Sequence, residues 1–427
     1  MTRTEALTAD IEALWRIPYP GPQNLLSAPA FTRLRDTCVT LYPNAGKKDR
    51  LGIPLSNALR ALGLPCGLPP SGGDLSLSPE DAAVRLDVAF GQTDGRRLYL
   101  CPLDMADRIM PALKFGPNTI RAYDSAELDA LVDGSRLARI NPNRRFDAKR
   151  FSQFHWLVVE QPFRVNEHVS HRAYSILDEV IGGDWGRIEP HRERFAGPVE
   201  AALFAVLQPP WEDWVDSAAI DWLGFNVPWA YQIDDDIFER SQPPPDPDSL
   251  TWEPDEVYDS RNDEWIYLGE RPVHYSFKLE VGEAANWLND DTWASLVDAR
   301  KSPLFETPIA HFFVRAFCAE GVDEFLAHIT TIEAALGLQS DYDKPGATRR
   351  MAKRVSTLFG ASTDGDDYRH LFDLRSRYLH GRPMNEIAGT DRLLARRLAR
   401  RVVNEIVSAA LRMPKSQSRE EYLKSLG

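Results

Sequence analysis

The sequence predicts an α+β protein of several domains, with a mixed α/β and β-rich N-terminal body and a C-terminal bundle made of helices alone. A chain of 427 residues is longer than one compact core usually requires, which favours two or three domains. Before residue 290 several segments alternate apolar and polar residues as strands do. The later segments repeat their apolar residues at helical intervals instead.

The distribution of charge divides the chain in a similar place. Residues 341–427 contain 18 basic and 11 acidic residues, whereas the other 340 residues contain 32 basic and 52 acidic ones. The net charge of −13 therefore hides a basic C-terminal part. This pattern fits a nucleic-acid partner for the helical end and argues against one for the acidic body, although an arginine-rich helix surface facing only solvent has the same composition.

We expect a mixed α/β domain over residues 1–150, a tryptophan-rich β-containing domain over 151–290, a helical bundle over 291–415 and a tail over 416–427. In the first domain, loop residues fill Gly63–Pro79, and Arg96–Pro102 has the composition of a strand. Short helices are expected at Ser56–Leu62, with Ser56 as the cap, and at Ser125–Val132.

The second domain contains ten of the eleven tryptophans if its end is extended to Trp293. Strands are expected at Trp156–Val165, Gly224–Ile233 and Pro272–Val281, with an acidic, proline-rich loop at Ser241–Glu256. The tryptophans either fill a β-rich core or offer aromatic faces to a ligand.

Two groups in this domain contain metal-ligating residue types. His168 and His171 are three residues apart, and three aspartates follow one another at Asp234, Asp235 and Asp236. The histidines have no third ligand nearby in the sequence, and adjacent carboxylates point in different directions. We therefore predict no metal site and no cofactor.

Cysteine usage and the absence of targeting signals predict a cytoplasmic protein. The four cysteines are far apart and form no CxxC pair, so we expect reduced thiols. No run of eighteen apolar residues occurs, which predicts no contact with a membrane. The N-terminal MTRTEALTADIEALW has the pattern of an amphipathic helix and lacks the features of a signal peptide.

The third domain should be an antiparallel helical bundle, because helical segments follow one another with short connections. Apolar residues repeat at helical spacing, and Gly360 is placed to end one of the helices. The expected helices are Pro308–Phe317, Val322–Leu338, Ala347–Phe359, Asp366–His380 and Arg392–Leu411.

Three blocks of this domain resemble the Apea-like branch of the HEPN (higher eukaryotes and prokaryotes nucleotide-binding) family. In order, they are Ile329–Gln339, Arg349–Gly360 and Tyr368–Gly381, and the resemblance covers about a quarter of the chain. Glu333 and Arg354 match supporting positions of the family pattern. The Arg-Ser-x-x-x-His-Gly ending of the pattern is matched by Arg375, Ser376, His380 and Gly381.

The resemblance implies an endoribonuclease that works without metal, in which Arg375 and His380 act in a cleft between two copies of the domain. It also implies a role in toxin-like growth arrest or antiviral defence, with a trigger ligand or protein sensed by the N-terminal body. The alternative is a non-catalytic HEPN module that binds nucleotide, RNA or a protein partner and mediates dimerisation.

The positions of Arg375 and His380 on their helix agree with a shared site. Leu371, Leu374 and Leu379 form its expected apolar side, and residues five apart diverge by about 140° around a helix. Two facing copies would bring one arginine and one histidine to the same phosphate. A histidine at a helix C-terminus interacts favourably with the backbone carbonyls when it is positively charged. An arginine that only pairs with Asp373 or Glu333, beside a histidine that only caps the helix, would give the same pattern.

Further residues are expected to contact RNA. Ser376, Arg377 and Tyr378 adjoin the motif, and Arg377 shares a helix face with His380. Arg396 and Arg400 belong to a stripe, begun by Arg392, that could follow a phosphate backbone. The stripe has an equally simple explanation as a solvated helix face.

Overall fold

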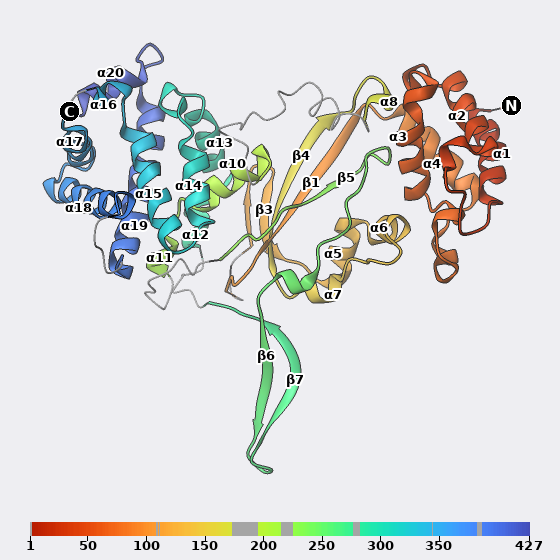
Figure 1. Ribbon diagram of the computed structural model, residues 1–427, viewed down its shortest axis with the longest axis horizontal. Helices are drawn as coiled ribbons and strands as arrows, with labels where there is room; N and C mark the ends of the chain where they lie inside the picture. Colours follow the sequence, from red (N-terminus) through yellow and green to blue (C-terminus); the bar gives the residue numbers. More distant parts are fainter. Residues whose placement is uncertain are drawn as a thin grey trace.

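The computed structural model describes residues 2–107, 110, 112–172, 195–214, 225–275, 282–343, 345–381 and 387–427. A unit of short helices stands at one end of the molecule, an antiparallel sheet in the middle and a larger group of helices at the other end (Figure 1). The predicted α+β class is confirmed. No helix in the described ranges is long and apolar enough to span a membrane.

The N-terminal unit is built from helices rather than from a mixture of helices and strands. Its core contains Leu7, Leu34, Leu55 and Phe90, which are fully or almost fully buried. Its helices are α1 (Arg3–Trp15), α2 (Pro29–Leu41), α3 (Lys48–Ala61), α4 (Pro79–Gly91) and α8 (Val169–Arg172). The expected helix at Ser56–Leu62 begins eight residues earlier, at Lys48, and contains Pro54.

The sheet has five antiparallel strands in the order β2-β3-β4-β1-β5. The strands are β1 (Asp94–Leu103), β2 (Leu113–Phe115), β3 (Asn118–Ala122), β4 (His155–Arg164) and β5 (Tyr231–Asp234). The strands expected near residues 96 and 156 are thus present and pair with each other along their full length. The domain boundary predicted at residue 150 falls inside this sheet and does not separate two domains.

Side chains alternate between two cores across the sheet, as the pleat requires. Leu98 and Leu100 of β1 face the core formed with α5 (Ser125–Val132), α6 (Gly134–Ile140) and α7 (Ala148–Phe151). Tyr99 and Cys101 face the core that the sheet shares with the C-terminal helices. The helix predicted at Ser125–Val132 is confirmed, and the four cysteines are free thiols.

Several of the tryptophans that the structure describes are core residues. Trp156 and Trp211 are fully buried, and Trp229 packs against Trp156 with ring centres 5.9 Å apart. Trp265 is the contrary case, with 67% of its surface exposed. Trp185 and Trp222 lie outside the described residues.

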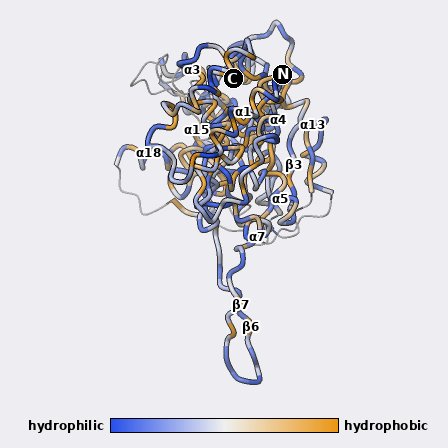
Figure 2. Tube along the Cα trace, turned by 90° about the vertical axis from the view of Figure 1, so that its right-hand side faces the viewer, coloured by the Kyte–Doolittle hydropathy of each residue, from blue (hydrophilic) through white to orange (hydrophobic). Residues whose placement is uncertain are grey.

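A β-hairpin formed by β6 (Trp252–Asp259) and β7 (Glu264–Pro272) extends away from the rest of the molecule (Figures 1 and 2). The strand β6 begins inside the loop predicted at Ser241–Glu256, and Leu268 of β7 is the extra residue of a bulge in the pairing. Of the strand predicted at Pro272–Val281, Pro272 is the last residue of β7 and His274 makes an isolated bridge to Met105, while residues 276–281 lie outside the described residues.

Helices from both sides of residue 291 make the C-terminal bundle. Central to it are α10 (Gly197–Val206), α14 (Ile309–Phe317), α15 (Gly321–Leu336), α17 (Ala347–Phe359), α18 (Ser362–Leu379) and α19 (Gly389–Arg412). Smaller helices are α11 (Trp211–Trp214), α12 (Glu283–Trp287), α13 (Asp290–Ala299), α16 (Gln339–Tyr342) and α20 (Arg419–Ser425). The five helices expected after residue 307 are confirmed.

Two boundaries of the bundle differ from the predicted ones. Because α10 packs on α14, the bundle and the sheet share one continuous core and no break occurs at residue 291. The expected tail at 416–427 contains the helix α20, whose Leu423 is fully buried. Short 3-10 turns complete the described chain: η1 (Leu25–Ser27), η2 (Pro43–Ala45), η3 (Pro65–Gly67), η4 (Pro70–Leu75), η5 (Pro247–Ser249) and η6 (Pro303–Phe305).

The carboxyl group of Glu239, just beyond β5, should make stability depend on pH. Burial, with the nearby charges of Asp236 and Asp234, raises the pKa of Glu239 to about 7 from an ordinary value of 4.5. The raised pKa means that the folded state favours the protonated carboxyl group. The protonated Glu239 therefore contributes its full share to the free energy of unfolding below pH 4.5. This contribution is lost as the pH rises towards 7.

Glu239→Gln should remove this dependence and make the protein more stable than wild type at pH 8, by about 2 kcal/mol after allowance for partial exposure. Urea unfolding at pH 4.5 and pH 8 measures the effect. Glu160→Gln, at an exposed residue of β4, is the control and should leave the difference between the two pH values unchanged. A Glu239→Gln variant with the wild-type difference would contradict the assignment.

Candidate functional site

The candidate site lies at the C-terminal end of α18. The helix ends at Leu379, and the backbone N–H of His380 donates to the carbonyl of Ser376 at 3.1 Å. Gly381 follows with φ = +61°, a left-handed conformation that glycine adopts without steric cost and that ends helices. The helix end expected at His380 is therefore present, and Arg382 and Pro383, which follow Gly381, lie outside the described residues.

The side chains around His380 face solvent. The imidazole is exposed and makes no hydrogen bond or ion pair with any residue in the described ranges. Arg377 is also exposed, and so are 47% of Tyr378 and 53% of Leu379. The expectation that Leu379 belongs to the buried apolar side of the helix was wrong, because the bundle ends before this last turn.

Arg375 is oriented towards the bundle by an ion pair. Its Nη2 lies 3.5 Å from Oε2 of Glu333 on α15, and its guanidinium lies 5.7 Å from the ring centre of Phe372. Burial raises the pKa of Glu333, and the charge of Arg375 opposes this effect. Of the two partners considered for Arg375, Glu333 is the one observed.

Arg354, which we predicted to support the site, lies inside the bundle. It is buried, and its guanidinium donates to Asp341, to the carbonyl of Leu336 at 2.9 Å and to that of Leu423 at 3.2 Å. Burial opposes ionisation of Asp341, but the hydrogen bonds from Arg354 and from the Leu338 N–H hold the pKa of this carboxyl below its usual value. Arg354 therefore joins α15, α16 and α20.

Arg396 and Arg400 do not contact solvent, so the prediction that they bind RNA does not fit the structure. Arg396 is 1% exposed and donates to Oε1 of Glu324 from Nε at 2.9 Å and from Nη2 at 2.5 Å. Arg400 is 2% exposed, donates to the carbonyl of Leu207 at 2.9 Å, and lies over the ring of Phe317. Burial lowers the pKa of Arg400 to about 9.

The neighbouring arginines show why the stripe misled the prediction. Arg397 and Arg401 occupy the exposed side of α19 and pair with Asp213 and Asp364. Arg396 and Arg400, which are four residues apart, face α15 and the end of α10. On α17 and α18, the exposed basic groups include Arg349, Lys353 and Arg377.

The two metal candidates have other partners. Asp234 pairs with Arg97 at 2.7 Å, and the buried Asp236 pairs with Arg172 at 2.9 Å. His171 lies 3.5 Å from a guanidinium nitrogen of Arg50. Among the described residues, no group of three or more histidine, cysteine or carboxylate side chains is placed to hold a metal ion.

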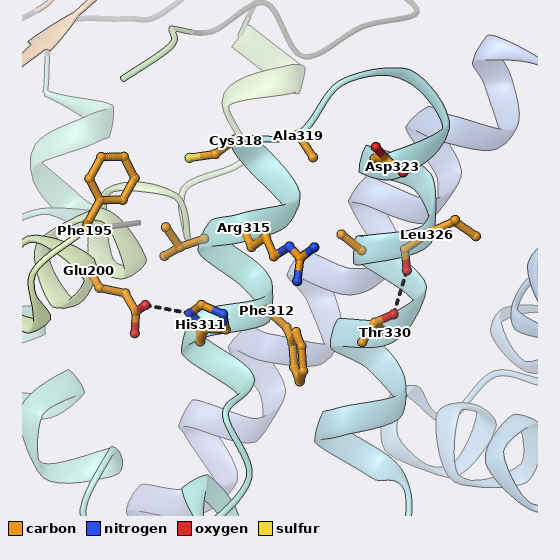
Figure 3. A pocket seen from close by; sticks show the side chains of 12 residues that line it. Phe195, Glu200, His311, Phe312, Arg315, Cys318, Ala319, Asp323, Leu326 and Thr330 are labelled. Carbon is orange, nitrogen blue, oxygen red and sulfur yellow. Dashed lines mark hydrogen bonds and ion pairs between the residues drawn. The ribbon is translucent and has the colours of Figure 1, made fainter. Parts of the chain in front are cut away.

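Sequence reasoning missed a second group of polar residues, which lines a cavity between α10, α14 and α15 (Figure 3). His311 and Arg315 are one helical turn apart on α14, and Glu200 of α10 is bonded to His311. The available signal was a histidine and an arginine at i, i+4 within an otherwise apolar run. Glu200 could not be assigned to them, because it is 111 residues away along the chain.

Comparisons with known proteins add no relative to this description. No family model, no curated protein and no solved structure matches the chain. The likeness to the HEPN pattern thus rests on the residues of the three blocks.

The ion pair between Arg396 and Glu324 predicts opposite outcomes for two adjacent substitutions. Arg396→Ala leaves the Glu324 carboxylate buried without its main cationic partner and should destabilise the protein by about 3–5 kcal/mol. Arg397→Ala, which breaks the exposed pair with Asp213, should cost at most about 1 kcal/mol. Urea unfolding of the two variants is the measurement. An Arg396→Ala variant that is as stable as wild type but binds RNA weakly would restore the surface role.

Proposed function

We propose that the C-terminal bundle is a metal-independent endoribonuclease, in which Arg375 of one copy and His380 of another act on the same phosphate. The observation that carries the proposal is the exposed imidazole of His380, which ends the helix that presents Arg375 and has no partner in the described part of the chain. A histidine at such a position is available to exchange protons with a substrate.

The proposed reaction uses the ribose 2′-hydroxyl as the nucleophile. One histidine removes the 2′ proton or protonates the departing 5′-oxygen, while the 2′-oxygen attacks phosphorus and the P–O5′ bond breaks. The products are a 2′,3′-cyclic phosphate and a 5′-hydroxyl end. Arg375 offers a planar set of donors to the phosphoryl oxygens, on which negative charge accumulates in the transition state.

Two features support a site composed from two copies. Arg375 is tied to Glu333 on the bundle side, whereas His380 lies about 140° further round the helix and faces solvent. Tyr378 and Leu379 expose apolar surface beside His380, as the centre of a protein interface does. We therefore include a homodimer that forms through the end of α18.

A non-catalytic HEPN module is the second candidate, and the Arg375–Glu333 ion pair favours it. Catalysis would require Arg375 to exchange the carboxylate for a phosphate. Under either function we assign the acidic body a sensing role for a trigger ligand or protein, in a cytoplasmic toxin or antiviral effector.

We predict that the purified protein cleaves RNA in the presence of EDTA and leaves 2′,3′-cyclic phosphate ends. Arg375→Ala and His380→Ala should each lower the rate at least about 100-fold, because each removes a group that acts on the reacting atoms. Arg369→Ala and His370→Ala, on exposed positions of the same helix, are the controls and should keep the activity. Cleavage that needs Mg²⁺ or survives both site substitutions would exclude the ribonuclease, and binding without cleavage would favour the module.

We predict that Leu379→Asp converts a dimer into a monomer and abolishes cleavage without unfolding the protein. The substitution places a charge in the apolar surface beside His380, at a side chain that is already more than half exposed. Light scattering gives the mass, and circular dichroism checks the fold. Leu411→Asp, at a similarly exposed leucine of α19, should remain dimeric. A wild-type protein that is monomeric with RNA bound would contradict the composite site.

A further inference from the structure

A cavity separate from the α18 site opens on the bundle between α10, α14 and α15 (Figure 3). Its volume of about 530 Å³ is in the range that small-molecule sites usually have. The wall combines apolar side chains with a few polar groups from α10 and from the consecutive helices α14 and α15. Such a combination positions a ligand and also fixes its orientation.

Arg315 provides a positive charge in this cavity. Its guanidinium points into the space between α14 and α15 (Figure 3), and it makes no hydrogen bond or ion pair with any residue in the described ranges. Asp323 lies at the opposite rim and is exposed. A cation on an apolar wall without a carboxylate bonded to it is suited to an anionic group, which a guanidinium binds through two parallel hydrogen bonds.

His311 adds an oriented imidazole one helical turn away from Arg315. Its Nδ1 lies 2.9 Å from Oε2 of Glu200, and both side chains are largely buried. Because a carboxylate accepts this hydrogen bond, Nδ1 carries a proton, and Nε2 donates to an anionic ligand when the ring is an imidazolium. Glu200 is thus a positioning residue, and His311 and Arg315 are the groups that would contact the ligand.

The apolar part of the wall suits a flat hydrocarbon body. Phe195 and Phe312 present aromatic rings on different sides of the cavity, and Leu326 adds an aliphatic surface from α15 (Figure 3). The hydroxyl of Thr330 already donates to the Leu326 carbonyl at 2.9 Å, so its oxygen can act only as an acceptor for a ligand. Aromatic rings gain most from stacking or edge contact with another ring.

We propose that this cavity binds a small organic anion with an aromatic body, namely an aryl carboxylate or an aryl phosphate monoester. The anionic group accepts hydrogen bonds from Arg315 and from the Nε2–H of the His311 imidazolium, and the ring lies between Phe195 and Phe312. This site is independent of the proposed ribonuclease centre, since it uses none of the α18 residues.

Calorimetric titration of the full-length protein tests the proposal with four probes. Benzoate and phenyl phosphate carry both features, inorganic phosphate lacks the ring and benzyl alcohol lacks the charge. We expect one or both aromatic anions to bind, and the two single-feature probes to bind at least tenfold more weakly. Which of the two aromatic anions binds more tightly distinguishes carboxylate from phosphate as the natural group.

Variants then locate the binding. Arg315→Gln should weaken the aromatic anion at least tenfold, and Arg315→Lys should restore part of the affinity because it keeps the charge. Arg349→Gln, on an exposed arginine of α17, is the matched control and should bind as wild type does. The proposal is overturned if neither aromatic anion binds, if Arg315→Gln binds unchanged, or if Arg349→Gln loses as much affinity. Thermal unfolding confirms that each variant is folded, and RNA cleavage has no part in the readout.

Discussion

The hydrogen bonds that buried arginines of α19 make to other elements hold the C-terminal half together. Arg396 binds Glu324 of α15, and Arg400 binds the carbonyl of Leu207 at the end of α10. Because α10 also packs on the sheet, the hydrogen bond between Arg400 of α19 and the end of α10 connects the bundle to the sheet. A buried charge without its partner is costly, so alternative placements of α19 that separate these groups are strongly disfavoured. The geometry of both proposed sites depends on this arrangement, because α15 contributes Glu333 to one and a wall to the other.

Features encoded by local patterns were predictable, and features that need a distant partner were not. The helix at Ala347–Phe359 was placed correctly because an apolar stripe precedes Gly360. The first half of α3 was not predicted, because Pro54 lies inside it and proline is uncommon in the interior of a helix. The boundary at residue 150 was wrong because the pairing of β1 with β4 joins segments about sixty residues apart.

The candidate site shows the same division. The helix end at His380 could be predicted from the sequence, because helix termination depends on local residues such as Gly381. The sequence left two acidic residues, Asp373 and Glu333, as candidate ion-pair partners of Arg375. Which of them pairs with Arg375 depends on how α15 packs against α18. The burial of Arg396 could not be predicted, because its partner Glu324 is 72 residues earlier in the chain. Arginines spaced four residues apart occur both on solvated helix faces and in buried ion pairs, so the local sequence does not distinguish the two.

The hairpin of β6 and β7 has a consequence for how the molecule fluctuates. It is held at its base, where Trp252 packs on Phe154 with ring centres 5.1 Å apart, whereas Trp265 further along is exposed. A two-stranded ribbon without a buried face is marginally stable by itself. Its amide hydrogens should therefore exchange with solvent through local opening of the hairpin. The amide hydrogens of β1 and β4 should exchange only when a much larger part of the protein unfolds. Seven acidic residues against two basic ones between Trp252 and Pro272 keep the open edges of such ribbons apart by charge repulsion, even at high concentration.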